Sequence, residues 1–154
     1  MRLVRVQTEP FTLESANALL TARHDVGALA VFVGQVRDFN DGADVSTLFL
    51  DHYPGMTEAS LEAIIDQAEA RWPLGGAMII HRVGELCAGE PIVLVAAASA
   101  HRQAAFEACQ FMMDVLKTEA PFWKREQGQA GAKWVEARES DTSARERWSV
   151  APTK

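Results

Sequence analysis

Short apolar runs recur along this chain, and their two-residue alternation or β-rich composition predicts strands. The predicted strands cover residues 2–7, 27–36, 45–53, 77–83 and 91–98. The run from Ile92 to Ala98 is apolar on both faces, whereas the run from Arg2 to Gln7 alternates. At least part of the sheet is therefore expected to be covered on both sides, and a second subunit could provide one of the covers.

Three segments repeat their apolar positions at the helical period of 3.6 residues. The first begins at Thr12, a good N-cap with an acid in the following turn, and is predicted to continue to about residue 22. The second is capped by Thr57 after a Pro-Gly turn and extends to residue 70, and the third covers residues 102–117. The apolar stripe of the third helix comprises Ala105, Cys109, Met112 and Leu116.

The remaining segments are irregular, apart from the region after the third helix. Residues 123–127 and 133–137 are predicted to form a hairpin, residues 84–90 read as a short irregular excursion, and the polar residues 38–44 read as a loop. From Glu139 onward the chain is charged and is expected to be loosely held. The order β-α-β-β-α-β-β-α-β-β predicts an α+β fold, a mixed or antiparallel sheet with helices packed on it.

Length and charge narrow the possible functions. With 154 residues the chain is predicted to be one domain, residues 1–154, whose polar tail starts at about residue 149. A formal net charge of −6 argues against a general nucleic-acid binder, so a basic site has to be a local cluster. The first residues lack the apolar core of a signal peptide, no apolar run is long enough to span a membrane, and Cys87 and Cys109 have no metal-ligand spacing. A reducing cytoplasm is the expected location, without membrane association.

Two lysines flank a Pro-Phe-Trp turn directly after the third helix. Pro121 ends the helix, which puts Lys117 in its last turns and Lys124 just beyond the turn. Phe122 and Trp123 are expected to hold the segment against the core. Two ammonium groups on such a wall suit an anionic substrate. The alternative is that these cations only complement the helix dipole.

Two further places could bind an anion. His101 and Arg102 follow Ser99 where a buried strand leads into the third helix, and a helix N-terminus with an arginine favours phosphate or carboxylate. Alternatively, Ser99 caps the helix and Arg102 is solvated. Arg37 ends the central strand shortly after Gly34, which permits close approach of another backbone, although a solvated loop arginine explains it equally well.

The remaining histidines and the absent motifs give little further chemistry. His52 could be a base or a hydrogen-bonded structural residue, and the isolated His24 and His81 are interpreted as structural. The chain has no His-Glu-x-x-His, Cys-x-x-Cys, Walker or Gly-x-Ser-x-Gly motif, which weakens metal, nucleotide-hydrolysis and serine-esterase readings. No metal and no cofactor are predicted.

Six segments in order, taken together, resemble the MoaE family, the large catalytic subunits of molybdopterin synthase. They are Gly34-Gln-Val-Arg37, Leu50-Asp-His-Tyr-Pro-Gly-Met56, His81-Arg-Val-Gly-Glu85, Ser99-Ala-His-Arg102, Lys117 to Arg125, and Trp134-Val-Glu-Ala-Arg-Glu-Ser-Asp141. The resemblance implies an α/β-hammerhead-like fold and a sulfurtransferase of molybdenum cofactor biosynthesis. Such an enzyme converts cyclic pyranopterin monophosphate into the molybdopterin dithiolene.

The resemblance also implies partners and site residues. The sulfur arrives as a thiocarboxylate on the C-terminal Gly-Gly tail of a small ubiquitin-like subunit, and a central homodimer with one small subunit at each end makes a heterotetramer. The implied catalytic residues are Lys117 and Lys124, with Arg138 completing the neighbouring subunit's pocket. The implied substrate-binding residues are Gln35, Val36, Arg37, His101, Arg102, Lys117, Lys124, Arg125, Glu126 and Arg138.

Two other functions remain open on the residues alone. The basic pocket could belong to a non-catalytic module that docks an acidic peptide tail, or to an unrelated acyl or phosphoryl enzyme that uses Lys117.

Overall fold

The computed structural model describes residues 1–21, 23–37, 47–127, 133–135 and 139–149, with only the backbone described for residues 124–127, 133–135 and 139–141. The predicted loop at residues 38–44 lies outside this range. The elements in chain order are β1 Arg2–Gln7, the 3-10 helix η1 Leu13–Leu19, β2 Ala28–Gln35, β3 Thr47–His52, α1 Met56–Arg71, β4 Leu74–Arg82, β5 Gly84–Cys87, β6 Pro91–Ser99, α2 Arg102–Glu119, β7 Phe122–Gln127, β8 Lys133–Val135 and α3 Glu139–Glu146.

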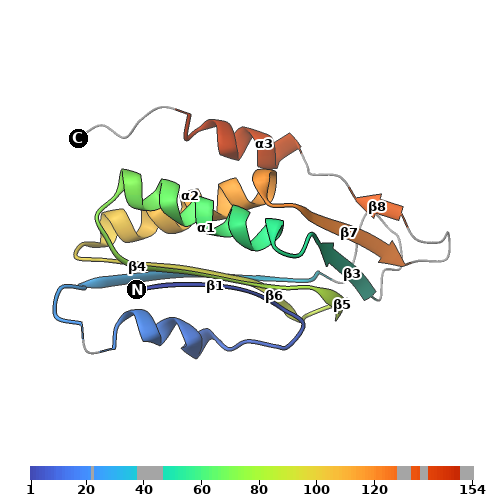
Figure 1. Cartoon of the computed structure of the whole chain (residues 1–154), viewed down its shortest axis with the longest axis horizontal. Coiled ribbons are helices and arrows are strands. Elements are labelled where there is room, and N and C mark those ends of the chain that lie inside the picture. Colours follow the sequence, from blue (N-terminus) through green and yellow to red (C-terminus); the bar gives the residue numbers. More distant parts are fainter. Residues whose placement is uncertain (22, 38–46, 128–132, 136–138, 150–154) are drawn as a thin grey trace.

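The strands form two four-stranded sheets (Figure 1). The first has the order β1-β4-β6-β2, in which β1 is parallel to β4 and the other pairs are antiparallel. The second has the order β5-β3-β7-β8 and is antiparallel throughout. This arrangement confirms the predicted α+β class and the hairpin made by β7 and β8.

The first sheet is covered on both faces, as the apolar run of β6 predicts. Helices α1 and α2 cover one face and η1 covers the other (Figure 1). Val93, Val95 and Ala97 pack with the α-helices, and the alternate residues Leu94 and Ala96 pack with η1. Both layers that cover β6, the α-helices on one face and η1 on the other, therefore belong to the same chain.

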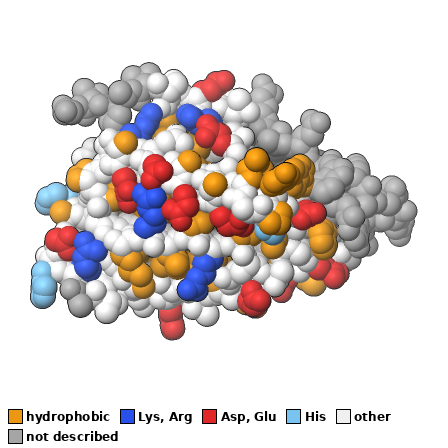
Figure 2. Space-filling view, viewed as in Figure 1, with side chains coloured by type: hydrophobic (Ala, Val, Ile, Leu, Met, Phe, Trp, Pro, Cys, Tyr) orange, Lys and Arg blue, Asp and Glu red, His pale blue; other side chains and the backbone are white. Residues whose placement is uncertain are grey.

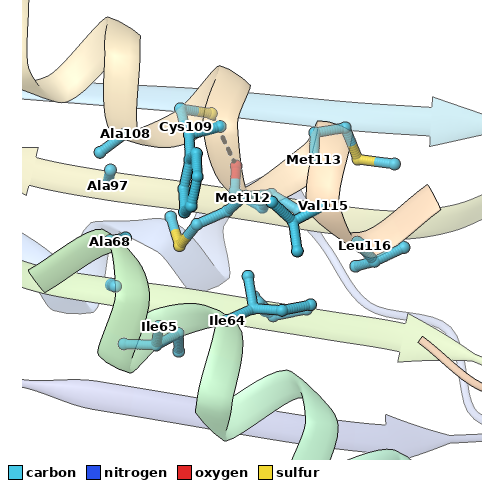
Figure 3. Close-up of a cluster of buried hydrophobic side chains, with 14 of the residues drawn as sticks. Ile64, Ile65, Ala68, Ala97, Ala108, Cys109, Met112, Met113, Val115 and Leu116 are labelled. Carbon is cyan, nitrogen blue, oxygen red and sulfur yellow. Dashed lines mark hydrogen bonds between the residues drawn. The ribbon is translucent and has the colours of Figure 1, made fainter. Parts of the chain in front are cut away.

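Helix α2 is anchored by an apolar face that contains the predicted stripe. Met112, Val115 and Leu116 meet Ile64 and Ile65 of α1 above the sheet, and all five are buried (Figure 3). Burying an aliphatic side chain of this size stabilises the fold by about 1.5–3 kcal/mol. The helix is consequently a rigid support for the residues at its two ends.

Two predicted helices differ from the structure in detail, although Thr12 is the N-cap residue as predicted. The segment after Thr12 is the short 3-10 helix η1, ending at Leu19, and the Thr12 side chain makes no capping bond. Helix α1 begins one residue before Thr57, and its N-cap is Gly55, whose φ of 85° favours glycine. Thr57 is fully buried, and its hydroxyl instead accepts a hydrogen bond from Tyr53 N–H and donates one to the Pro121 carbonyl.

Two segments expected to be irregular are ordered. The start of the predicted excursion, Gly84–Cys87, is strand β5 and pairs with β3. The segment from Glu139 is helical rather than loosely held, because Trp148 packs edge-on against Trp72 and Phe111, each at 5.6 Å between ring centroids. No helix among the described residues has the length and apolar character needed to cross a membrane.

Candidate active site

Lys117 lies at the end of α2 where the chain turns into β7. The helix continues to Glu119, two residues past the predicted end, and Ala120 is already extended with φ −79° and ψ 131°. Pro121 follows and stops the helix as predicted. Lys117 is exposed in the last turn, so its ammonium group is available to a ligand at this end of the helix.

The turn after Lys117 is held by two contacts from elsewhere in the chain. The Thr57 hydroxyl donates to the Pro121 carbonyl at 3.1 Å. The ring of His81 stacks on Phe122, with 3.9 Å between centroids and 20° between planes. The prediction that Phe122 pins the segment is confirmed, whereas Trp123 is 40% exposed because neighbouring strand residues point to opposite sides.

Three further predicted residues follow in β7. The backbone of Lys124, Arg125 and Glu126 pairs in register with Leu50, Phe49 and Leu48 of β3. Their side chains, and all of Arg138, lie outside the described residues. The fold therefore brings the backbone of these three residues to the end of α2 that carries Lys117.

The segment from Gln35 to Arg37 lies at the same end of the molecule. Gln35 pairs with Pro91, the first residue of β6, and Val36 is hydrogen-bonded to the turn just before it. Helix α2 follows β6 and runs back along it, so its C-terminal end returns towards the start of β6 (Figure 1). Arg37 and Gln35 are exposed there, and Val36 is half-buried.

His101 and Arg102 lie at the opposite end of α2. His101 is the N-cap without a side-chain capping bond, and both residues are exposed. Ser99 is buried and donates to the Pro73 carbonyl at 2.7 Å, so the alternative that it caps the helix is wrong. The 15 positions from Arg102 to Lys117 rise by about 22 Å. A single chain does not bring these two cations together.

Charges elsewhere on the surface are mixed in sign. The face drawn in Figure 2 has acidic and basic side chains next to one another. Arg2 lies within 3.1 Å of a carboxylate oxygen in each of Glu62, Asp66 and Glu69. Within the described residues no group of three or more His, Cys, Asp or Glu side chains is placed to hold a metal ion.

Two residues at the end of β4 contact the β7 segment and the turn that is hydrogen-bonded to Val36, and the sequence did not indicate this role. His81 is 6% exposed and stacks on Phe122, and Arg82 is 5% exposed and bonds to the carbonyls of Thr8 and Pro91. The sequence feature that could have pointed to these residues is a His-Arg pair at the end of an otherwise apolar strand. His52 lies 3.5 Å from Glu58, in keeping with its structural reading.

The sequence and the fold of the chain are both similar to those of known proteins. A family model described as MoaE protein matches residues 6–119. The molybdopterin synthase catalytic subunits of Pseudomonas aeruginosa and Escherichia coli are 55% and 53% identical to the chain, over 94% and 93% of it and 97% and 95% of their own lengths. The solved structure of a molybdopterin biosynthesis MoaE protein from Burkholderia ambifaria superposes with a TM-score of 0.83 at 49% identity, covering 97% of this chain and 99% of that one.

Proposed function

Since this chain belongs to the MoaE family of molybdopterin synthase catalytic subunits, we propose that its reaction is carried by Lys117 and Lys124 where α2 leads into β7. The chain is an enzyme of molybdenum cofactor biosynthesis. It transfers sulfur from the C-terminal thiocarboxylate of a small partner subunit to cyclic pyranopterin monophosphate and so forms the molybdopterin dithiolene.

The charges of the two reactants explain why cations belong at this end of the molecule. The substrate carries a phosphate and the donor a thiocarboxylate, so both are anions that approach a chain of net charge −6. A local group of cations that includes Arg37 and Lys117 offsets that repulsion. Because the donor supplies sulfur through an acyl group, the enzyme itself needs no cysteine nucleophile.

The exposed Lys117 on a rigid helix end is the observation that carries the catalytic assignment. Buried neighbours fix α2, and the turn that follows is held at Pro121 and Phe122. The ammonium group is thus presented to a donor tail that enters along this end. There Lys117 transfers a proton or holds the acyl group transiently, while Lys124 and Arg125 contact the anionic groups, and Glu126 belongs to the same substrate-binding segment.

The distance along α2 supports a substrate site shared by two subunits. His101 and Arg102 can meet Lys117 only if they come from another copy of α2. In a homodimer whose two-fold axis is perpendicular to α2, two α2 helices side by side run antiparallel, which brings the Arg102 end of one to the Lys117 end of the other. Arg138 of the neighbouring subunit completes the pocket.

An apolar surface suits this homodimer. Strand β2 is at the edge of the first sheet, and Phe32 on it is 42% exposed. Phe106 on the adjoining α2 is 66% exposed. Exposed edge strands and large apolar side chains favour pairing with another chain. With a small sulfur-carrier subunit at each outer end, the assembly is a heterotetramer.

The domain organisation and location follow the same reasoning. We assign residues 1–154 to one catalytic domain with a polar tail from about residue 149. We place the reaction in the cytoplasm, because Cys87 and Cys109 are both free thiols, the state that a reducing compartment maintains.

One assay tests the proposed function against its alternatives. The chain is incubated with the thiocarboxylated small subunit and cyclic pyranopterin monophosphate, and dithiolene formation is measured by oxidation to a fluorescent pterin. Wild-type protein yields product and the Lys117→Ala variant does not. Binding of the tail without product would favour the docking module, and turnover without the sulfur donor would favour an unrelated enzyme.

A further inference from the structure

We propose that His81 and Arg82, the last two residues of β4, are positioning residues that hold the two cation-bearing segments of the site. This inference rests on the proposed function, because it says what holds Lys117, Lys124 and Arg37 in their relative places. Adjacent strand residues point to opposite faces of a sheet, so one strand end can contact both the β7 segment and the turn that holds the Arg37 segment.

His81 holds the segment that joins the two lysines. Its buried ring stacks on Phe122, which is five residues after Lys117 and two before Lys124. Nδ1 of His81 lies 2.8 Å from the main-chain carbonyl of Arg82, which fixes the orientation of the ring. The position of the first residue of β7 relative to the end of α2 is therefore set by this ring.

Arg82 holds the turn that supports Arg37. Its Nε and Nη2 donate to the Thr8 carbonyl at 3.2 and 3.0 Å, and its Nη1 donates to the Pro91 carbonyl at 3.3 Å. The same Nη1 lies 3.8 Å from the carboxylate of Glu90. The Arg82 guanidinium thus joins the start of β6 to the loop after β1.

The turn held by Arg82 forms two backbone hydrogen bonds with Val36, the residue before Arg37. The Val36 N–H donates to the Glu90 carbonyl at 3.0 Å, and the Gly89 N–H donates to the Val36 carbonyl at 2.7 Å. Oε2 of Glu90 accepts from the Cys87 N–H at 2.6 Å and closes the turn. The residue before Arg37 is therefore held through both of its backbone polar groups.

The cation-bearing segments of the site have to be held in place by other residues. Lys117, Lys124 and Arg37 repel one another when no anion is bound, and segments that are free to move would separate. A buried histidine and a buried arginine are costly to desolvate, and an apolar pair would serve stability at least as well. Their position at the site end of β4, after the apolar residues Ala77 to Ile80, is explained by the two segments that they hold.

The test separates ring stacking from general stability by using two variants of His81. His81→Asn keeps a hydrogen-bonding group near Nδ1 and loses the ring, whereas His81→Phe keeps a ring that can stack on Phe122. With the thiocarboxylated partner present and rates normalised to folded protein, His81→Asn should lower kcat roughly 10- to 100-fold with little change in KM. His81→Phe should restore kcat to within about threefold of wild type.

Substitution of Arg82 is predicted to change KM more than kcat. Arg82→Lys keeps the positive charge but loses the hydrogen bonds that the three guanidinium nitrogens donate. The KM for the cyclic pterin should therefore rise about tenfold, while kcat changes less. Ile79→Val, a buried change in the same strand that touches neither segment, is the matched control and should leave both constants unchanged.

Each result supports or overturns one part of the proposal. Wild-type kcat in His81→Asn, or an equal loss in His81→Phe, overturns the role of His81, and an unchanged KM in Arg82→Lys overturns that of Arg82. If His81→Asn does not fold, His81→Leu, which also removes the ring, takes its place and should lower kcat in the same way. If Arg82→Lys does not fold, Glu90→Gln takes its place and should raise KM. Lys117→Ala in the same series separates failure of the proposed function from failure of this inference. If Lys117→Ala stays active, the proposed catalytic site is wrong. If only Lys117→Ala is inactive, the catalytic site stands and the positioning role is wrong.

Discussion

Arg102 and Lys117 stand at opposite ends of α2, about 22 Å apart along its axis. Both side chains are exposed, and the helix between them is anchored by buried residues from Ala105 to Leu116. A helix packed in this way has no bend that would bring its ends together. A substrate that contacts both cations must therefore lie between two copies of the helix.

Mixing two impaired variants should restore activity at subsaturating substrate. A dimer of one Lys117→Ala chain and one Arg102→Ala chain has one site with both residues intact and one with neither. After subunit exchange, half of the dimers are mixed, so about a quarter of wild-type activity should return. Mass spectrometry of the mixed assemblies verifies the exchange. No recovery after verified exchange would place each site within a single chain.

Lys117→Ala should abolish turnover without affecting the fold. The side chain is exposed, so its removal should change the free energy of unfolding by less than about 0.5 kcal/mol. The measurements are single-turnover dithiolene formation and a urea melt of the same preparation. Arg147→Ala, which removes another exposed cation near the end of α3, serves as the control and should keep full activity.

Arg37→Ala and Arg102→Ala should each weaken substrate binding. A charge-assisted hydrogen bond to a phosphate contributes about 1.5–3 kcal/mol, which corresponds to a loss of roughly one to two decades in affinity. Calorimetric titration with cyclic pyranopterin monophosphate measures the Kd. Unchanged affinity in both variants would move the phosphate site elsewhere.

The two cysteines should differ sharply in reactivity. Burial raises the pKa of the Cys109 thiol to about 11, and this thiol donates to the Val95 carbonyl at 3.4 Å (Figure 3). At pH 8 only about one Cys109 in a thousand is then the reactive thiolate. A disulfide reagent should label the exposed Cys87 quickly and Cys109 only after denaturation. Rapid labelling of two thiols in the native protein would contradict this burial.

Trp148→Ala should destabilise the protein by roughly 2–4 kcal/mol. The Trp148 ring meets Trp72 and Phe111 edge-on, and its indole N–H donates to the Asp114 carboxylate at 2.7 Å. Trp148→Phe keeps a ring and loses the hydrogen bond, so it should cost about 1 kcal/mol less than the alanine variant. Urea midpoints at constant slope give both values. A loss below about 0.5 kcal/mol in the alanine variant would show that this contact does not hold the C-terminal helix.

Local periodicity determined most of the elements correctly. The stripe from Ala105 to Leu116 predicted α2, the doubly apolar run in β6 predicted a sheet covered on both faces, and Pro121 predicted where the helix ends. These features depend on which faces of one element are buried, and the sequence encodes that directly through the spacing of apolar residues. The ordered motifs also sufficed to identify the family.

Only the tertiary structure decided which of these residues meet. Thr57 looked like a helix cap and instead supports Pro121, and His81 looked isolated and instead stacks on Phe122. Arg102 and Lys117 looked like parts of one pocket and lie a helix apart. Such contacts depend on strand register and on the path of the chain, and a pattern of local spacing contains neither, because the residues that meet are tens of positions apart.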